Sequence, residues 1–252
     1  MLDIEIAQII ILSTIGLLAG VINTLAGGGS NLSLPALMMF GLPADVANAT
    51  NRVSVFFQSL TASAGFYRHD KIETSSVKDT FIPLLIGGLI GALVASYLDV
   101  EILKPVLLAT MILTSFWVVL RSNPDAASSE KPLSCYDNKY GLLATFAAGF
   151  YGGFIQAGVG FVLIAAFVGA LRYDLIKANA LKMVATLIFT SVALSVFIFR
   201  DQIAWLPGII LAFGSIIGAQ IAVKFAVSIS AKTLKIMVLL MTIVASIAAM
   251  LT

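Results

Sequence analysis

The sequence predicts an all-α integral membrane protein with about eight transmembrane helices, and three observations support this prediction. First, 60% of the 252 residues are hydrophobic and 11% are charged, with a mean hydropathy of +1.03. A soluble domain carries about 25% charged residues, so lipid must face much of this surface. Second, the apolar residues gather in segments long enough to cross a bilayer. Third, the second half of the chain repeats the first at a constant offset.

Bilayer-spanning helices need about 20 mostly apolar residues. Segments of this kind lie at 5–26, 46–67, 79–98, 102–121, 139–157, 177–199, 203–224 and 233–252. Two shorter apolar pieces, 30–41 and 160–171, would be about 18 Å long as helices and could not cross alone. We therefore expect them to be half-helices or re-entrant segments.

One polar segment divides the chain. Residues 122–138 are rich in proline, serine and asparagine and carry charges of both signs, which is typical of a linker. The sequence thus predicts a first transmembrane repeat over 1–121, a polar linker loop over 122–138 and a second repeat over 139–252.

The repeat becomes visible when the chain is shifted on itself by 158 − 27 = 131 residues. Gly27 and Gly29 then fall on Gly158 and Gly160 without any gap, and several polar residues coincide as well. The polar coincidences include Asn48 on Asn179, Asp70 on Asp201 and Lys104 on Lys235. We expect two homologous four-helix repeats, each with a short half-helix broken by glycine. Matching broken helices are typical of secondary transporters, whose substrate lies between the repeats. The sequence leaves open whether the repeats are parallel or inverted and which side the termini face.

Glycine-rich breaks are the first candidate substrate-binding segments. Three consecutive glycines weaken a helix by about 1 kcal/mol each relative to alanine. The half-helix that follows would start inside the membrane with free N–H groups, which an anion and the helix dipole can satisfy together. The alternative is close helix packing through small residues. The candidates in and near the two breaks are Gly27, Gly28, Gly29, Ser30, Asn31, Gln156, Gly158 and Gly160.

Cations and asparagines at the start of two long spans are the second group of candidates. Asn48, Asn51 and Arg52 lie in one repeat, and Asn179 and Lys182 lie in the other. Lys182 falls one residue from Arg52 after superposition. An ionisable group at membrane depth is costly and usually lines a polar pathway, and Arg with Asn donors suits an oxyanion. The alternatives are helix-capping asparagines and cations that reach the membrane surface.

Several function classes are disfavoured by what the sequence lacks. Its carboxylates lie at span ends or in loops, which argues against a cation carrier; if protons are coupled, the substrate itself could carry them. We find no Cys/His metal cluster, catalytic triad or phosphate loop, and the single His69 lies in a loop. We therefore expect no enzyme, cofactor or metal. The net charge of +2 is spread out, so we expect no nucleic acid. The expected partners are a small anionic substrate and the lipid bilayer, with the oligomeric state, monomer or homodimer, left open.

At these motifs the chain resembles the sulfite exporter TauE/SafE family of prokaryotic membrane proteins. The resemblance rests on residues 19–29, Pro35, 47–52 and 178–182, while Val159 interrupts the second glycine run. It implies a multi-pass protein of the bacterial cytoplasmic membrane that transports sulfite, a sulfonate or a related organic anion. Two alternatives stay open from the residues alone: a passive anion channel or uniporter, and a membrane scaffold that transports nothing.

Overall fold

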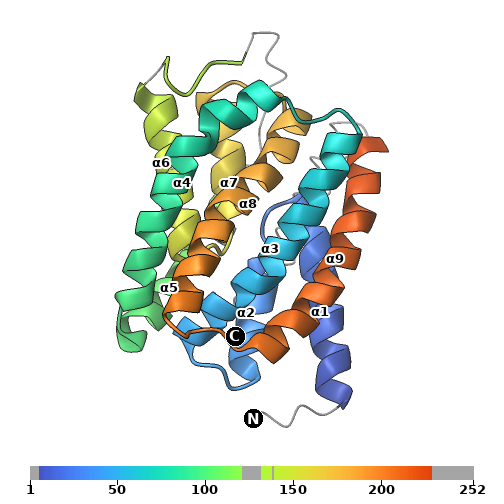
Figure 1. Cartoon of the computed structure of the whole chain (residues 1–252), viewed down its shortest axis with the longest axis vertical. Coiled ribbons are helices and arrows are strands. Elements are labelled where there is room, and N and C mark those ends of the chain that lie inside the picture. The colour runs from blue at the N-terminus through green and yellow to red at the C-terminus, as the bar shows by residue number, and fades with distance from the viewer. Residues whose placement is uncertain (1–5, 121–131, 138, 229–252) are drawn as a thin grey trace.

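The computed structural model describes residues 6–120, 132–137 and 139–228, and within these residues it is helical without any strand. The N-terminal half contains five helices (Figure 1): α1 (Ile6–Leu25), α2 (Ser30–Met39), α3 (Ala44–Arg68), α4 (Thr74–Tyr97) and α5 (Val100–Leu120). The C-terminal half contains α6 (Lys139–Phe154), α7 (Val159–Ile164), the π-helix η1 (Ala165–Ala170), α8 (Leu175–Phe199) and α9 (Trp205–Ser228).

Four helices in the described residues are long and apolar enough to cross a membrane: Ile6–Leu25, Thr74–Tyr97, Leu175–Phe199 and Trp205–Ala226. Helix α3 has 25 residues but carries a stripe of polar side chains that are buried inside the protein. The predicted span 233–252 and most of the predicted linker 122–138 lie outside the described residues. By their length and composition, these helices support a multi-pass membrane protein.

The two short segments return along the helix that precedes them. Leu37, near the end of α2, packs in one cluster with Leu12, in the first half of α1. In the same way Leu171, just after η1, lies against Gly141 near the start of α6. Each pair is therefore a hairpin: α3 begins at the end of the bundle where α1 began, and α8 begins at the end where α6 began. The predicted re-entrant pieces 30–41 and 160–171 correspond to α2 and to α7 with η1.

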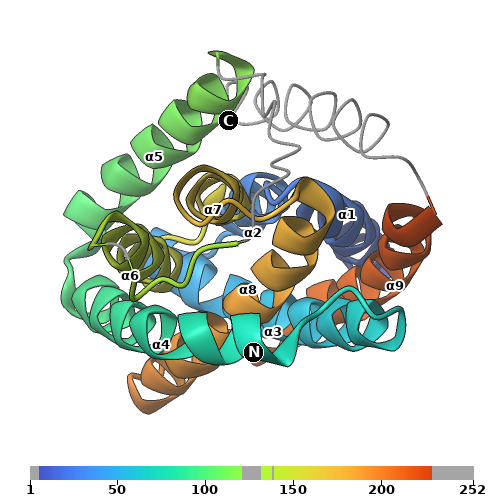
Figure 2. The ribbon, with the colours of Figure 1, turned by 90° about the horizontal axis from the view of Figure 1, so that it is seen from above.

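The remaining helices pack in a crossed arrangement (Figures 1 and 2). Helix α1 lies along α9 and α4 lies along α6, while α3 and α8 lie between these pairs and contact each other. The start of α3 meets the end of α8, because Ala49 and Phe197 share a cluster. The end of α3 meets the start of α8, because Phe66 and Met183 share another. Helices α3 and α8 are thus antiparallel.

Helices that correspond at the offset of 131 residues have matching bounds. Adding 131 to α3 (44–68) gives 175–199, and adding 131 to α4 (74–97) gives 205–228, which are the bounds of α8 and α9. These corresponding helices run in opposite directions, since α3 and α8 are antiparallel and each is followed by a short turn. The hairpins of the short segments explain this, because a hairpin adds no net crossing.

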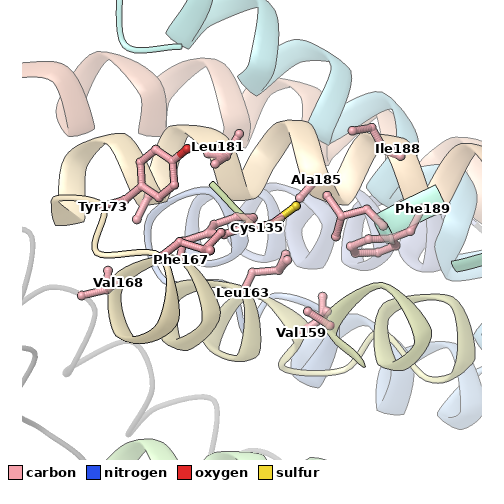
Figure 3. Close-up of a cluster of buried hydrophobic side chains, with 14 residues drawn as sticks. Cys135, Val159, Leu163, Phe167, Val168, Tyr173, Leu181, Ala185, Ile188 and Phe189 are labelled. Atoms are coloured by element: carbon pink, nitrogen blue, oxygen red, sulfur yellow. The ribbon is translucent and has the colours of Figure 1, made fainter. Parts of the chain in front are cut away.

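Small residues allow the helices to approach closely. A Cβ added at Gly153 of α6 would overlap the backbone of Gly88 in α4, and one added at Gly214 of α9 would overlap Ser13 in α1. In lipid, such van der Waals packing replaces the hydrophobic effect as the force between helices. Between α7–η1 and α8, larger side chains fill the interior, among them Phe167, Leu181 and Phe189 (Figure 3).

Candidate functional site

A stripe of polar side chains on α3 forms one wall of the centre. Asn48, Asn51, Arg52 and Gln58 recur at helical spacing and therefore share one side of the helix. All four are buried, and Arg52 is 0% exposed. Such a set can only be buried when other elements supply hydrogen-bond partners.

The partners of Arg52 are the last carbonyls of α6. Its guanidinium donates to the carbonyl oxygens of Gly152, Gly153 (2.9 Å) and Phe154 (3.2 Å). It also donates to Asn48 Oδ1 at 3.4 Å, and Asn48 Nδ2 donates to the same Phe154 oxygen at 3.0 Å. The last carbonyls of a helix have no partner within it and carry the negative end of the helix dipole, so a cation there is favourable.

Lys182 has the equivalent position at the end of α1. Its Nζ donates to the carbonyl oxygens of Asn23 (2.9 Å) and Thr24 (3.2 Å), and to Asn179 Oδ1 at 2.7 Å. Gln58 of α3 contacts the same turn through Asn23 and Thr24. Each half of the chain therefore contributes a cation that caps the broken helix of the other half.

The two glycine breaks cross each other in direct backbone contact. The N–H of Gly160 donates to the carbonyl of Gly27 at 3.2 Å, and a Cβ at either glycine would overlap the other residue. Gly27 and Gly158 have φ of 103° and 68°, and Gln156 has φ of 69°. At Gly27 and Gly160 close packing thus accounts for the glycine, which was one of the two interpretations of the sequence.

The start of α2 holds Asn51 in place. Ser33 Oγ donates to Asn51 Oδ1 at 2.6 Å, and Asn51 Nδ2 donates to Ser30 Oγ at 3.0 Å. Gly28, Asn31 and the tightly packed Gly29 are buried in the same α1–α2 break. On the other side, Gln156 Nε2 donates to Thr190 Oγ1 of α8 at 3.2 Å.

The charges of this centre are unbalanced. Among the described residues, the buried charged side chains are Arg52 and Lys182, and no carboxylate is buried. Among the described residues, the buried polar atoms without a hydrogen-bond partner include Arg52 Nε, Asn179 Nδ2 and Gln156 Oε1. Two of these are donors. Within the described ranges, no three His, Cys, Asp or Glu side chains gather as a metal site.

The predicted site residues come from four places: the α1–α2 break, the α6–α7 break, α3 and α8. The structure joins Asn48 and Arg52 to the end of α6, Asn179 and Lys182 to the end of α1, and Gly27 to Gly160. The predicted set did not include Asn23, Ser33 and Thr190, which hydrogen-bond to its members. It also did not include Gln58, which hydrogen-bonds to Asn23. A signal for Gln58 and Thr190 was present. Gln58 lies two helical turns beyond Asn51, and Thr190 lies two turns beyond Lys182, on the same side of each helix.

Comparison with known proteins gives consistent matches over nearly the whole chain. The family described as "Sulfite exporter TauE/SafE" matches residues 12–249. A "Probable membrane transporter protein" of Haemophilus influenzae is 28% identical over 241 residues, which are 96% of this chain and 94% of the relative. The "Probable membrane transporter protein YfcA" of Escherichia coli is 27% identical over 94% of this chain and 87% of its own length. No solved structure matches the chain.

Proposed function

Because the chain belongs to the sulfite exporter TauE/SafE family of membrane transporters, we propose that it is a secondary transporter for a small anion. The expected substrate is sulfite, a sulfonate or a related organic anion, and the expected place is the bacterial cytoplasmic membrane. The observation that carries the proposal is the pair of buried cations, Arg52 and Lys182, without a buried carboxylate among the described residues.

The charge of the centre favours an anion. A buried cation is costly unless opposite charge or hydrogen bonds compensate it. The ends of α1 and α6 each supply roughly half a negative charge. Two cations and two helix ends therefore leave about one positive charge. A small oxyanion would neutralise this remainder and accept hydrogen bonds from the unpartnered donors of Arg52 and Asn179.

A carrier mechanism requires access from one side at a time. We propose that the two halves are an inverted duplication and that they rock against each other around the centre, as in other transporters with broken helices. The substrate would meet Asn48, Asn51, Arg52, Asn179 and Lys182. Since each cation caps a helix of the opposite half, movement of the halves would change the caps and the substrate site together. Transport, and no chemical reaction, would be the activity.

Flux into liposomes that contain the purified protein tests this function. We expect saturable uptake of radiolabelled sulfite or sulfoacetate, with loss of uptake in Asn179→Leu, which removes an unpartnered donor. Thr61→Ala, a partly exposed position on α3, serves as the control. Single-channel steps in electrical recordings would instead identify an anion channel. Absence of flux for every small anion tested would contradict transport and favour a scaffold.

A further inference from the structure

A pocket opens at the end of the bundle where α3 ends and α8 begins. Residues of both halves line it: Lys71, Ile72, Glu73, Ser76, Tyr173, Lys177 and Leu181. We call this set the vestibule. The lining residue furthest along α8 is Leu181, and the buried Lys182 is the next residue in the chain. The vestibule therefore lies at the start of α8, in the same part of this helix as the buried cation.

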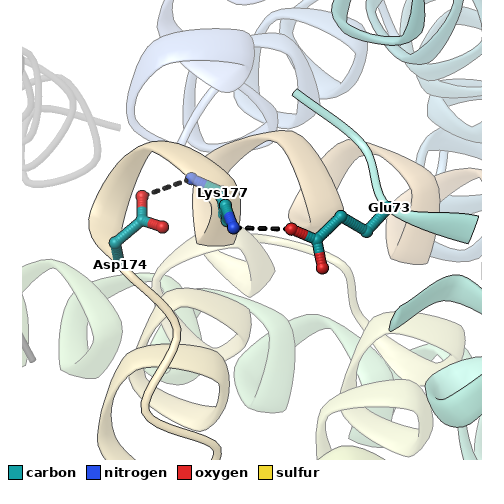
Figure 4. A network of polar contacts seen from close by, with 3 residues as sticks. All are labelled: Glu73, Asp174 and Lys177. Carbon is teal, nitrogen blue, oxygen red and sulfur yellow. Dashed lines mark hydrogen bonds and ion pairs between the residues drawn. The ribbon is translucent and has the colours of Figure 1, made fainter. Parts of the chain in front are cut away.

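One ion pair crosses the vestibule between the two halves. Lys177 Nζ lies 2.5 Å from Glu73 Oε1, and the two side chains are 43% and 50% exposed (Figure 4). The Lys177 backbone N–H is held separately by Asp174 Oδ1 at 2.9 Å. Glu73 precedes α4 without capping it through its side chain. Half-exposed ion pairs contribute little stability, so this contact can open without unfolding either helix.

The other groups in the vestibule can donate to an anion. Of the residues that line the vestibule, Lys71 and Lys177 are cationic and Glu73 is anionic, while the Asp174 carboxylate next to the lining is held by the Lys177 N–H. Burial raises the pKa of the Tyr173 phenol and the nearby carboxylates of Asp79 and Glu73 add to this, although a hydrogen bond with Ser76 acts in the opposite direction. The hydroxyl of Tyr173 thus stays protonated at neutral pH and can donate a hydrogen bond, as can that of Ser76.

We propose that the vestibule is a binding site for the transported oxyanion on its way to the centre, and that Glu73 competes with the oxyanion for Lys177. In the structure the Glu73 carboxylate is paired with the Lys177 ammonium group. An oxyanion that reaches the vestibule replaces this carboxylate on Lys177, and the link between the two halves at this end is broken. The site depends on the proposed anion transport, but its charge selectivity can be measured without flux.

Accessibility of an introduced thiol measures that selectivity. The variant Ser76→Cys is made in a Cys135→Ser background, which removes the single native cysteine, and the full chain is placed in liposomes. Two thiol reagents of similar size are compared, a methanethiosulfonate with a sulfonate group and one with a trimethylammonium group. The readout is the ratio of their reaction rates.

Removal of one charge at about 7 Å changes the local concentration of an ion about threefold in water, and more in a less polar pocket. We expect Glu73→Gln to raise the ratio of anionic to cationic rates at least about threefold, and Lys177→Gln to lower it similarly. The control variant Glu101→Gln, at the start of α5, should leave the ratio unchanged. Sulfoacetate, which does not react with these reagents, should slow the reaction of both.

Equal ratios in the Glu73→Gln and Lys177→Gln variants would overturn the proposal. A thiol that neither reagent reaches in any variant would also overturn it, because a vestibule must admit water. Shifted ratios without measurable flux would keep the anion site and reject the proposed transport. As a second measurement, Lys177→Gln should raise the KM for sulfite flux severalfold with an unchanged maximal rate; a normal KM would count against the vestibule.

Discussion

Replacement of Lys182 by methionine tests the role of the buried cation. Methionine keeps much of the side-chain volume but removes the ammonium group, which donates three hydrogen bonds at 2.7–3.2 Å. Three acceptors, the carbonyls of Asn23 and Thr24 and the Asn179 amide oxygen, then remain buried without this donor. Each such acceptor costs about 1–3 kcal/mol. Because loss of a buried charge is itself stabilising, we expect the low end of the sum, about 3 kcal/mol.

Thermal unfolding of the purified protein in detergent measures this loss. Lys78→Met removes a cation from an exposed position on α4 and should change stability by less than about 0.5 kcal/mol. An unfolding temperature of Lys182→Met equal to that of the unmodified protein would refute the reasoning. It would mean that the end of α1 has other donors and that Lys182 does not hold it.

Two further predictions follow from close contacts. Gly160→Ala should prevent correct folding, because its Cβ would overlap the backbone of Gly27, whereas Gly169→Ala, with nothing within 4 Å of the added Cβ, should be tolerated; protein recovered in monodisperse form distinguishes them. Burial, with the negative charge of Asp79, raises the pKa of the Cys135 thiol to about 12. Since the thiolate is the reactive form, maleimide labelling should be slow at pH 7, rise about tenfold per pH unit, and become faster in Asp79→Asn.

Within the described residues, the sequence was sufficient to place the helices, because composition and length mark the long apolar segments. The predicted span 177–199 became α8 (Leu175–Phe199), and the predicted half-helix 30–41 became α2 (Ser30–Met39). The direction of the halves could not be predicted in this way. It depends on whether α2 and α7–η1 return or cross, and a short apolar segment has the same composition in both cases.

The sequence singled out the two buried cations of the centre but not their contacts. The cost of a buried charge was enough to single out Arg52 and Lys182. Their partners could not be found from the sequence, because backbone carbonyls accept hydrogen bonds in any residue type. Gly152 and Thr24 carry no side-chain signal that marks them as acceptors of a distant cation. The contact between Gly27 and Gly160 likewise follows only from the crossing of the two breaks.

The most direct test of an anion site between Arg52 and Lys182 is the thermal stability of the purified protein with sulfite, sulfate, thiosulfate, sulfoacetate, taurine and simple carboxylates. A ligand that binds only the folded protein adds about 2.7 kcal/mol at a hundredfold excess over its Kd. We predict such a shift from sulfite or a sulfonate, and its loss in Lys182→Met measured against that variant's own unfolding temperature. If no anion shifts the unfolding temperature, or if Lys182→Met shows the full shift, the buried cations do not form the substrate site.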